Sequence, residues 1–304
     1  AANQQSSLNF TRSNELEADH IGIKILVDAG FDPEAMPRFF QRMQKSSRLH
    51  GVKLPEFLRT HPVDDTRIAD AKNRVSQYSR KPKPDSINYL LMRYRLNVLL
   101  GQNASLIARH FQKRLKSGYS LNKDAVRYGL ALSLARSGKH QQARNHINKL
   151  LKKDPARLAY LIAAGEIEQS AKNLKKVNDL FGDALALYPN NYTVIYYYSN
   201  ALMQLNQPKQ AYKIMHKYIA NRENKINAPL HNAYSHAAAK TGKLDEAYYH
   251  RAEYFYLTGH LKLALDQFKK AAHNNKNDEI LEAKIVTRIS TVQSEIALAK
   301  KKKK

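Results

Sequence analysis

The chain has 304 residues, no cysteine and a formal net charge of +25. A hydrophobic fraction of 43% is enough to form real cores and excludes a disordered protein. The absence of cysteine excludes disulfides and thiolate metal sites. No stretch approaches the ~18 consecutive apolar residues of a transmembrane helix, and the length has room for about two domains.

The positive charge is concentrated in one part of the chain. Residues 1–80 hold 12 Lys and Arg against 10 Asp and Glu, whereas the remainder holds 39 against 16. We therefore expect the partners of the second part to be acidic or anionic.

The first predicted helix runs from Ser13 or Asn14 to Ala29, because either residue can cap an acidic first turn. The polar residues 1–12 before it are expected to fray. Gly30 is placed to end the helix in a left-handed conformation.

Two carboxylates on this helix form the first candidate site. Glu15 and Asp19 are four residues apart and project from one face, next to an apolar stripe. A buried carboxylate must be paired or must bind a metal. On pattern alone, a helix start with solvated acids is the alternative. His20 is interpreted as structural or exposed, because it lies on another side of the helix.

A second helix is predicted to begin at Asp32-Pro33, with Asp32 as its N-cap and Pro33 at its first helical position. Its apolar face, which we expect to be core, comprises Met36, Phe39, Phe40 and Met43.

Residues 44–60 are predicted as a loop that leads into Thr60-His61-Pro62 and then a helix starting near Asp64. A loop histidine before proline is commonly a turn residue, and an active-site role for His61 is the alternative. Residues 79–85 contain two prolines and several charges, which favours an extended linker. The predicted organisation is a first domain over 1–80, a linker over 81–85, a second domain over 86–299 and a basic tail over 300–304.

The second domain carries an internal repeat of 34 residues. Three sets of positions recur at this spacing: Gly138, Lys172 and Asn206; Ala143, Val177 and Ala211; and Ile147, Phe181 and Met215. Pro155 and Pro189 close two of the units. A small residue, then a large apolar one, then proline at this period is typical of tetratricopeptide repeats. The predicted fold class is therefore all-α, with a helical solenoid after the first domain.

Further units extend the array on both sides. Residues 88–119 are predicted as a first repeat, and later units begin at Gly242 and Gly259. The steps of 36 and 17 residues to these two glycines predict an irregular join. Each unit buries its apolar face only by stacking on the next, and the inner groove of such a solenoid is the usual recognition surface.

Aromatic trios mark candidate binding residues in this groove. Each trio spans more than one helix face, so at least one member should face the groove; the candidates are Tyr196, Tyr197, Tyr198, Tyr254 and Tyr256. Core packing is the alternative for most of them. The Lys300–Lys304 run is predicted to be a solvated tail that also favours anionic surfaces.

The motif Glu-x-x-Ala-Asp-x-x-Gly over 15–22, together with residues 29–33 and Thr60-His61-Pro62, resembles HtpX-like and CAAX-prenyl-protease-like zinc metallopeptidases, metallopeptidase family forty-eight. In that family a His-Glu-x-x-His helix supplies two zinc histidines and the general base, and it comes first in the chain. The resemblance implies that Glu15 is the third zinc ligand and that Asp19 orients a zinc histidine. It also places His61 near the active site.

No His-Glu-x-x-His occurs in this sequence. Because a catalytic zinc needs three protein ligands and hydrolysis needs a base, we expect no catalytic residue in this chain. The resemblance implies the C-terminal portion of a zinc metalloendopeptidase. The parent protein would bind zinc, and this chain alone would be inactive.

A zinc protease followed by repeats, without membrane helices, is similar to family members that work in the periplasm of Gram-negative bacteria. The resemblance implies that the repeats hold polypeptide substrates or components of outer-membrane β-barrel assembly. The lack of cysteine suits an oxidising compartment. A non-enzymatic scaffold for protein partners remains open. A nucleic-acid or anionic-surface binder is a further alternative, although no nucleic-acid-binding motif is present.

Overall fold

The computed structural model describes residues 2–50, 63–78, 85–118, 122–221, 227–276 and 278–301; for 2–11, 46–50 and 300–301 it describes the backbone only. These residues form α-helices and no strand. They fall into two compact units, residues 1–86 and 87–304. Within the described ranges, no helix combines the length and the apolar character needed to cross a membrane.

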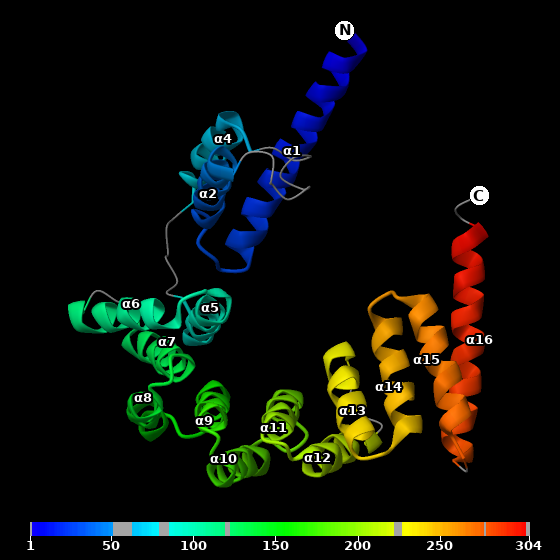
Figure 1. The fold of residues 1–304 in the computed structure, drawn as a ribbon. Coiled ribbons are helices and arrows are strands. Elements are labelled where there is room, and N and C mark those ends of the chain that lie inside the picture. Colours follow the sequence, from blue (N-terminus) through cyan, green and yellow to red (C-terminus); the bar gives the residue numbers. More distant parts are fainter. Residues whose placement is uncertain are drawn as a thin grey trace. The chain divides into compact units, whose positions relative to one another are not determined.

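The first unit is built on α1 (Ala2–Asp28), α2 (Ala35–His50) and α4 (Asp65–Val75), with α4 packed against both of the others (Figure 1). One buried side chain from α1, one from α2 and three from α4 make its core: Ile23, Phe40, Ile68, Ala71 and Val75. α4 therefore fixes the positions of α1 and α2 in this unit.

The first helix begins earlier than the sequence predicts. α1 starts at Ala2, so Ser13 and Asn14 lie inside it and the predicted cap is wrong. Residues 2–12 contain neither glycine nor proline, so nothing prevents the helix from continuing through them. Its predicted end is confirmed, because Gly30 has a φ of 73° and the Phe31 N–H donates to the Leu26 carbonyl at 2.8 Å.

The start of the second helix follows the prediction only in part. The Asp32 Oδ1 accepts a hydrogen bond from the Glu34 N–H at 3.0 Å, as a cap should. Regular α-helix begins at Ala35 and not at Pro33. Phe40 is buried, but Phe39 is 49% exposed, so the prediction of Phe39 as core is wrong.

The second unit is a curved array of helix pairs (Figure 1). Its helices are α5 (Ile87–Leu100), α6 (Ala104–Ser117), α7 (Lys123–Arg136), α8 (His140–Lys153), α9 (Leu158–Ser170), α10 (Leu174–Leu187), α11 (Tyr192–Gln204), α12 (Pro208–Ala220), α13 (Ala228–Lys240), α14 (Leu244–Leu257), α15 (Leu261–Asn274) and α16 (Glu279–Lys301). α7, α9, α11 and α13 pack against one another in succession on the inner side of the curve, while α8, α10 and α12 lie outside.

The predicted 34-residue register is confirmed by backbone and burial. Gly138, Lys172 and Asn206 occupy the turn inside successive pairs and all have a positive φ, of 78°, 57° and 56°. The small and large residues that recur after each turn are all buried: Ala143, Val177 and Ala211, then Ile147, Phe181 and Met215. The sequence thus predicts which residues face the neighbouring unit.

The irregular join has a structural explanation. α14 follows the left-handed Gly242 and precedes the left-handed Gly259, which gives both of its ends the turn found inside a regular pair. It packs extensively against α13 before it and α15 after it. One helix therefore serves two successive pairs, which accounts for the 17-residue step.

Close helix approach inside a pair depends on glycine, and Gly165→Ala tests this. A Cβ at Gly165 would lie under 3.0 Å from three atoms of the Phe181 ring, which is fully buried and stacked on Tyr198. We expect Gly165→Ala to lower the free energy of unfolding by about 1–2 kcal/mol, because overpacking outweighs the better helix propensity of alanine. Urea denaturation measures this.

Gly182→Ala on α10 is the matched control. Gly182 is exposed, and a Cβ there would meet nothing within 4 Å, so alanine should stabilise the chain by about 0.5–1 kcal/mol. If both variants were equally stabilised, the ring contact with Gly165 would not constrain the pair.

Candidate functional site

Glu15 and Asp19 converge on one arginine from another helix. Arg67 of α4 donates from Nε to Asp19 Oδ2 and from Nη2 to Asp19 Oδ1, both at 2.8 Å. Its Nη1 lies 3.0 Å from Glu15 Oε2. Asp19 is only 6% exposed. A buried carboxylate must be paired or must bind a metal, and here the arginine provides the pairing.

Local structure around Arg67 explains how it is held. The Asp64 carboxylate caps α4 by accepting the Arg67 N–H at 2.9 Å, which fixes the first turn. The guanidinium carbon lies 5.1 Å from the centre of the Phe40 ring on α2. Its hydrogen bond to Asp19 raises the pKa of Arg67, with further help from the charge of Glu15. Arg67 therefore remains charged and joins α1, α2 and α4.

A second polar contact lies on the same two helices. His20 Nε2 is 2.7 Å from Asp70 Oδ2 on α4, so His20 has a structural partner. Neither Arg67 nor Asp70 could be predicted as a partner, because nothing in the residue spacing indicates which α4 side chains meet α1. His61 lies outside the described residues.

The described residues do not fit a complete zinc site. Among them, no group of three His, Cys, Asp or Glu side chains could hold a metal ion. A catalytic zinc takes three protein ligands and a water, and of the predicted ligands only Glu15 belongs to this part of the chain.

The aromatic candidates of α11 divide into two kinds. Tyr198 is 5% exposed, stacks on Phe181 and donates to Asn178 Oδ1 at 2.9 Å, so it belongs to the core and is removed from the candidate binding residues. Tyr196 and Tyr197 are half-buried and pack edge to face, with ring centres 5.8 Å apart. They remain candidates for contact with a partner.

The candidates of α14 are half-buried and already engaged within the fold. Tyr254 lies under the Arg251 guanidinium at 5.3 Å. Tyr256 lies under Arg288 at 4.1 Å, and its hydroxyl donates to Glu295 Oε1 at 2.7 Å. Tyr256 therefore helps to fasten α14 to α16, and only part of its ring is accessible.

An arginine on α5 links the first inner helices, and the sequence did not reveal it. Arg95 is buried and donates to the Tyr128 hydroxyl on α7 at 2.9 Å and to Glu166 Oε1 on α9 at 2.5 Å. Its guanidinium also covers the Tyr197 ring of α11 at 4.9 Å. Burial raises the pKa of Glu166, whose Oε2 has no hydrogen-bond partner among the described residues.

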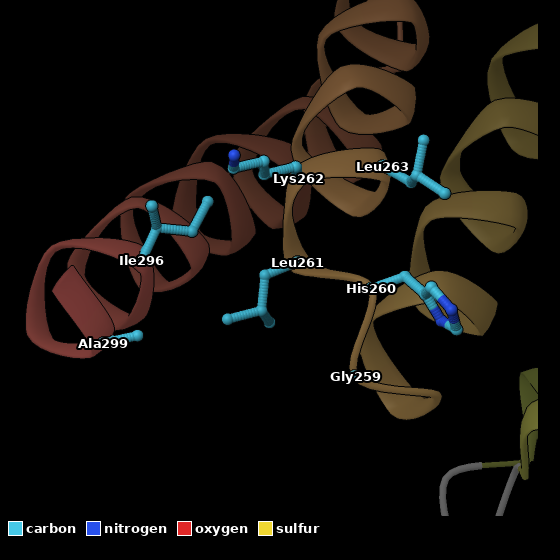
Figure 2. A pocket seen from close by; sticks show the side chains of 7 residues that line it. All are labelled: Gly259, His260, Leu261, Lys262, Leu263, Ile296 and Ala299. Carbon is cyan, nitrogen blue, oxygen red and sulfur yellow. The ribbon is translucent and has the colours of Figure 1, made fainter. Parts of the chain in front are cut away.

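A hollow of about 570 Å³ lies between the start of α15 and the C-terminal half of α16. Figure 2 shows Leu261 in the space that separates the α14–α15 turn from Ile296 and Ala299. The walls are mostly apolar, with His260 and Lys262 at the edge. It offers room for an apolar side chain of a partner, and it carries no catalytic group.

Comparison with known proteins shows that the first unit is similar to metallopeptidases. Residues 1–75, which include the Glu15–Asp19–Arg67 group, match the sequence model described as Peptidase family M48. This match confirms the resemblance drawn from the Glu15–Gly22 motif.

The whole chain is similar to named proteases. It is 30% identical over 293 residues to the beta-barrel assembly-enhancing protease of Yersinia pestis and 28% identical to that of Escherichia coli K12, in each case over 96% of this chain. The chain spans 60% and 59% of the length of these two relatives. A tetratricopeptide repeat protein from Parabacteroides merdae matches 92% of this chain and 99% of its own at 13% identity, with a TM-score of 0.46.

Proposed function

We propose that this chain is the C-terminal part of a zinc metalloendopeptidase whose repeat unit binds protein substrates or partners in outer-membrane protein assembly and quality control. The observation that carries the proposal is the Glu15–Asp19 pair, one helical turn apart and oriented by Arg67, inside the segment that matches the peptidase family. The similarity to assembly-enhancing proteases over 96% of the chain supports the same role for both units.

In this proposal Glu15 supplies one ligand to a zinc ion whose other ligands belong to the longer protein. Asp19 orients a neighbouring zinc histidine, a role in which its firm attachment to Arg67 is useful because such supporting carboxylates must not move. His61 is a further candidate at the active site. The isolated chain is inactive, since it offers neither the remaining ligands nor a general base.

We place the protein in the Gram-negative periplasm. The names of its relatives point to β-barrel assembly, a process of the outer membrane, and the lack of cysteine suits an oxidising compartment. Tyr196 and Tyr197 on α11, and the accessible parts of Tyr254 and Tyr256, are the residues we propose for contact with protein partners.

The test compares this chain with a longer form that restores the upstream His-Glu-x-x-His helix. Zinc content and casein cleavage are measured for both, and for Glu15→Gln in the longer form. We expect about one zinc per molecule in the longer form. Glu15→Gln should abolish cleavage, because loss of one of three ligands weakens zinc binding by far more than tenfold.

Glu17→Gln is the matched control. Glu17 is exposed on α1, two residues from Glu15, and this change should leave zinc and activity unaltered. A Glu15→Gln protein that keeps zinc and activity would remove Glu15 from the site. A longer form without zinc or activity would favour the alternative of a non-enzymatic repeat scaffold.

A further inference from the structure

The outer helices of the repeat unit differ in charge from the inner ones. The outer helices α6, α8, α10 and α12 carry thirteen Lys and Arg against two Asp, whereas the inner helices α5, α7, α9, α11 and α13 carry six against three Asp and Glu. Figure 1 shows α8, α10 and α12 along the outside of the curve. The excess positive charge is therefore on the side opposite the inner groove.

α12 presents the most regular part of this charge. Lys209, Lys213 and Lys217 follow one another at intervals of four, are all exposed, and form no ion pair with a described residue. Like charges at this spacing destabilise a helix by about 0.2–0.5 kcal/mol per pair. These three lysines therefore do not stabilise α12. An external anion would reduce the electrostatic repulsion among their ammonium groups.

Exposed cations also lie on α8 and α6, while α10 between α8 and α12 carries exposed Lys175 and Lys176 together with exposed Asp179 and Asp183. The set that we call the outer basic face comprises Arg109, Lys113, Lys116, Lys149, Lys152, Lys209, Lys213 and Lys217, all exposed. Three other cations of α6 and α8 already have partners within the chain: Arg144 with Glu168, Lys153 with Asp124, and Arg114 over the Tyr94 ring. Seven of the eight members are lysines. A lysine ammonium acts as a point charge, so these residues suit attraction to a diffuse negative surface better than bidentate binding of a single phosphate.

We infer that the outer basic face docks the repeat unit on an anionic phospholipid bilayer. Lysines near such a surface are attracted at distances up to about 10 Å, so they need not lie in one plane. Leu106 of α6 and Leu187 of α10 are 57% and 55% exposed on the same outer helices and can enter the headgroup region.

The same helices are poorly equipped for nucleic acid. Stacking on bases needs accessible aromatic rings, but Phe111, Phe181 and Tyr218 are buried. The Tyr212 hydroxyl is bound to Glu246. A bilayer needs only the charge and a few apolar side chains, and both are present.

Sedimentation with vesicles tests the inference on the whole chain. Vesicles of phosphatidylglycerol and phosphatidylcholine are compared with phosphatidylcholine alone at about 0.1 M salt. We expect binding to the anionic vesicles only. The triple variant Lys209→Gln, Lys213→Gln and Lys217→Gln should weaken that binding by ~10- to 100-fold.

The control triple is Lys24→Gln, Lys72→Gln and Lys240→Gln, which removes the same charge from exposed positions away from the outer helices. It should weaken vesicle binding by less than about threefold, because salt screens charges that lie more than a Debye length from the membrane. Circular dichroism checks that both triples keep their helix content. Equal losses in the two triples, binding to neutral vesicles, or tighter binding to a DNA duplex than to vesicles would each overturn the inference.

Discussion

Replacing Arg67 by methionine should lower the free energy of unfolding of residues 1–86 by about 3–5 kcal/mol. Methionine keeps much of the apolar length of arginine but removes the cation that binds Asp19 through two hydrogen bonds and pairs with Glu15. Asp19 is almost fully buried, so its carboxylate would lose its charge partner without gaining water. Hydrogen exchange of α1 and α4 amides in the whole chain measures the loss.

Two further variants test whether the unpaired charge of Asp19 causes this loss of stability. Arg74→Met on the same helix removes a half-exposed contact with Asp70 and should cost no more than about 1 kcal/mol. Adding Asp19→Leu to Arg67→Met should recover much of the stability, because the buried charge disappears with its partner. If Arg67→Met cost no more than Arg74→Met, the arginine would not be what holds the carboxylates of the candidate site.

Acid should destabilise the repeat unit through a buried pair of histidines. His231 on α13 and His250 on α14 are 7% and 8% exposed, and their Nδ1 atoms are 2.8 Å apart. One Nδ1 donates a hydrogen bond to the other, and a second proton on this buried pair would remove the acceptor. Burial lowers the pKa of His231 to about 4, assisted by the charge of Arg288. Burial also places the pKa of His250 well below its usual range.

The direction of the pH dependence of stability follows from the number of protons that the folded and unfolded chains bind. Between the ordinary histidine pKa of about 6.5 and the lowered value of about 4, the unfolded chain binds protons that the folded chain does not. Stability is therefore complete above pH ~6.5 and falls as the pH drops towards ~4, by about 3 kcal/mol for His231 alone. Urea midpoints across this range measure the slope.

The variant His231→Gln distinguishes the contribution of this histidine pair to the loss of stability in acid from the contributions of other groups. His231→Gln can still donate an amide N–H to His250 but cannot be protonated, so it should reduce the loss of stability in acid by about half. His110→Gln, at an exposed position on α6, is the control and should leave the slope unchanged. An unchanged slope in His231→Gln would show that acid acts elsewhere.

The repeat register could be predicted because each turn and each buried position imposes its own residue type. Gly138 at a left-handed turn and Phe181 in the gap between helices recur for steric reasons, and a spacing of 34 makes them visible in one sequence. The position of Lys172 could be assigned only from this spacing, since a lysine does not by itself indicate a positive φ.

The start of α1 and the partner of its carboxylates could not be predicted in the same way. Ser13 is a good capping residue, but capping preference decides a helix start only where the preceding residues favour leaving the helix, and residues 2–12 do not. The pairing of Arg67 with Asp19 joins residues 48 apart, and no local rule links such positions.

The histidine pair and Phe39 illustrate two other limits. His231 and His250 meet because α14 packs fully along α13, a tertiary fact that their separation of 19 residues does not encode. Phe39 and Phe40 are equally apolar, yet only Phe40 turns towards α4. A pattern that places both on one apolar face cannot resolve a difference of 100° about the helix axis.

The central claim is that Glu15 binds zinc in the complete protease. Diffraction data from the longer protein, collected at the zinc absorption edge, test it most directly. The account predicts an anomalous peak at about 2.0–2.2 Å from a Glu15 carboxylate oxygen, with Arg67 still bound to Asp19. A zinc peak held entirely by other residues, with Glu15 bound to Arg67 alone, would contradict it.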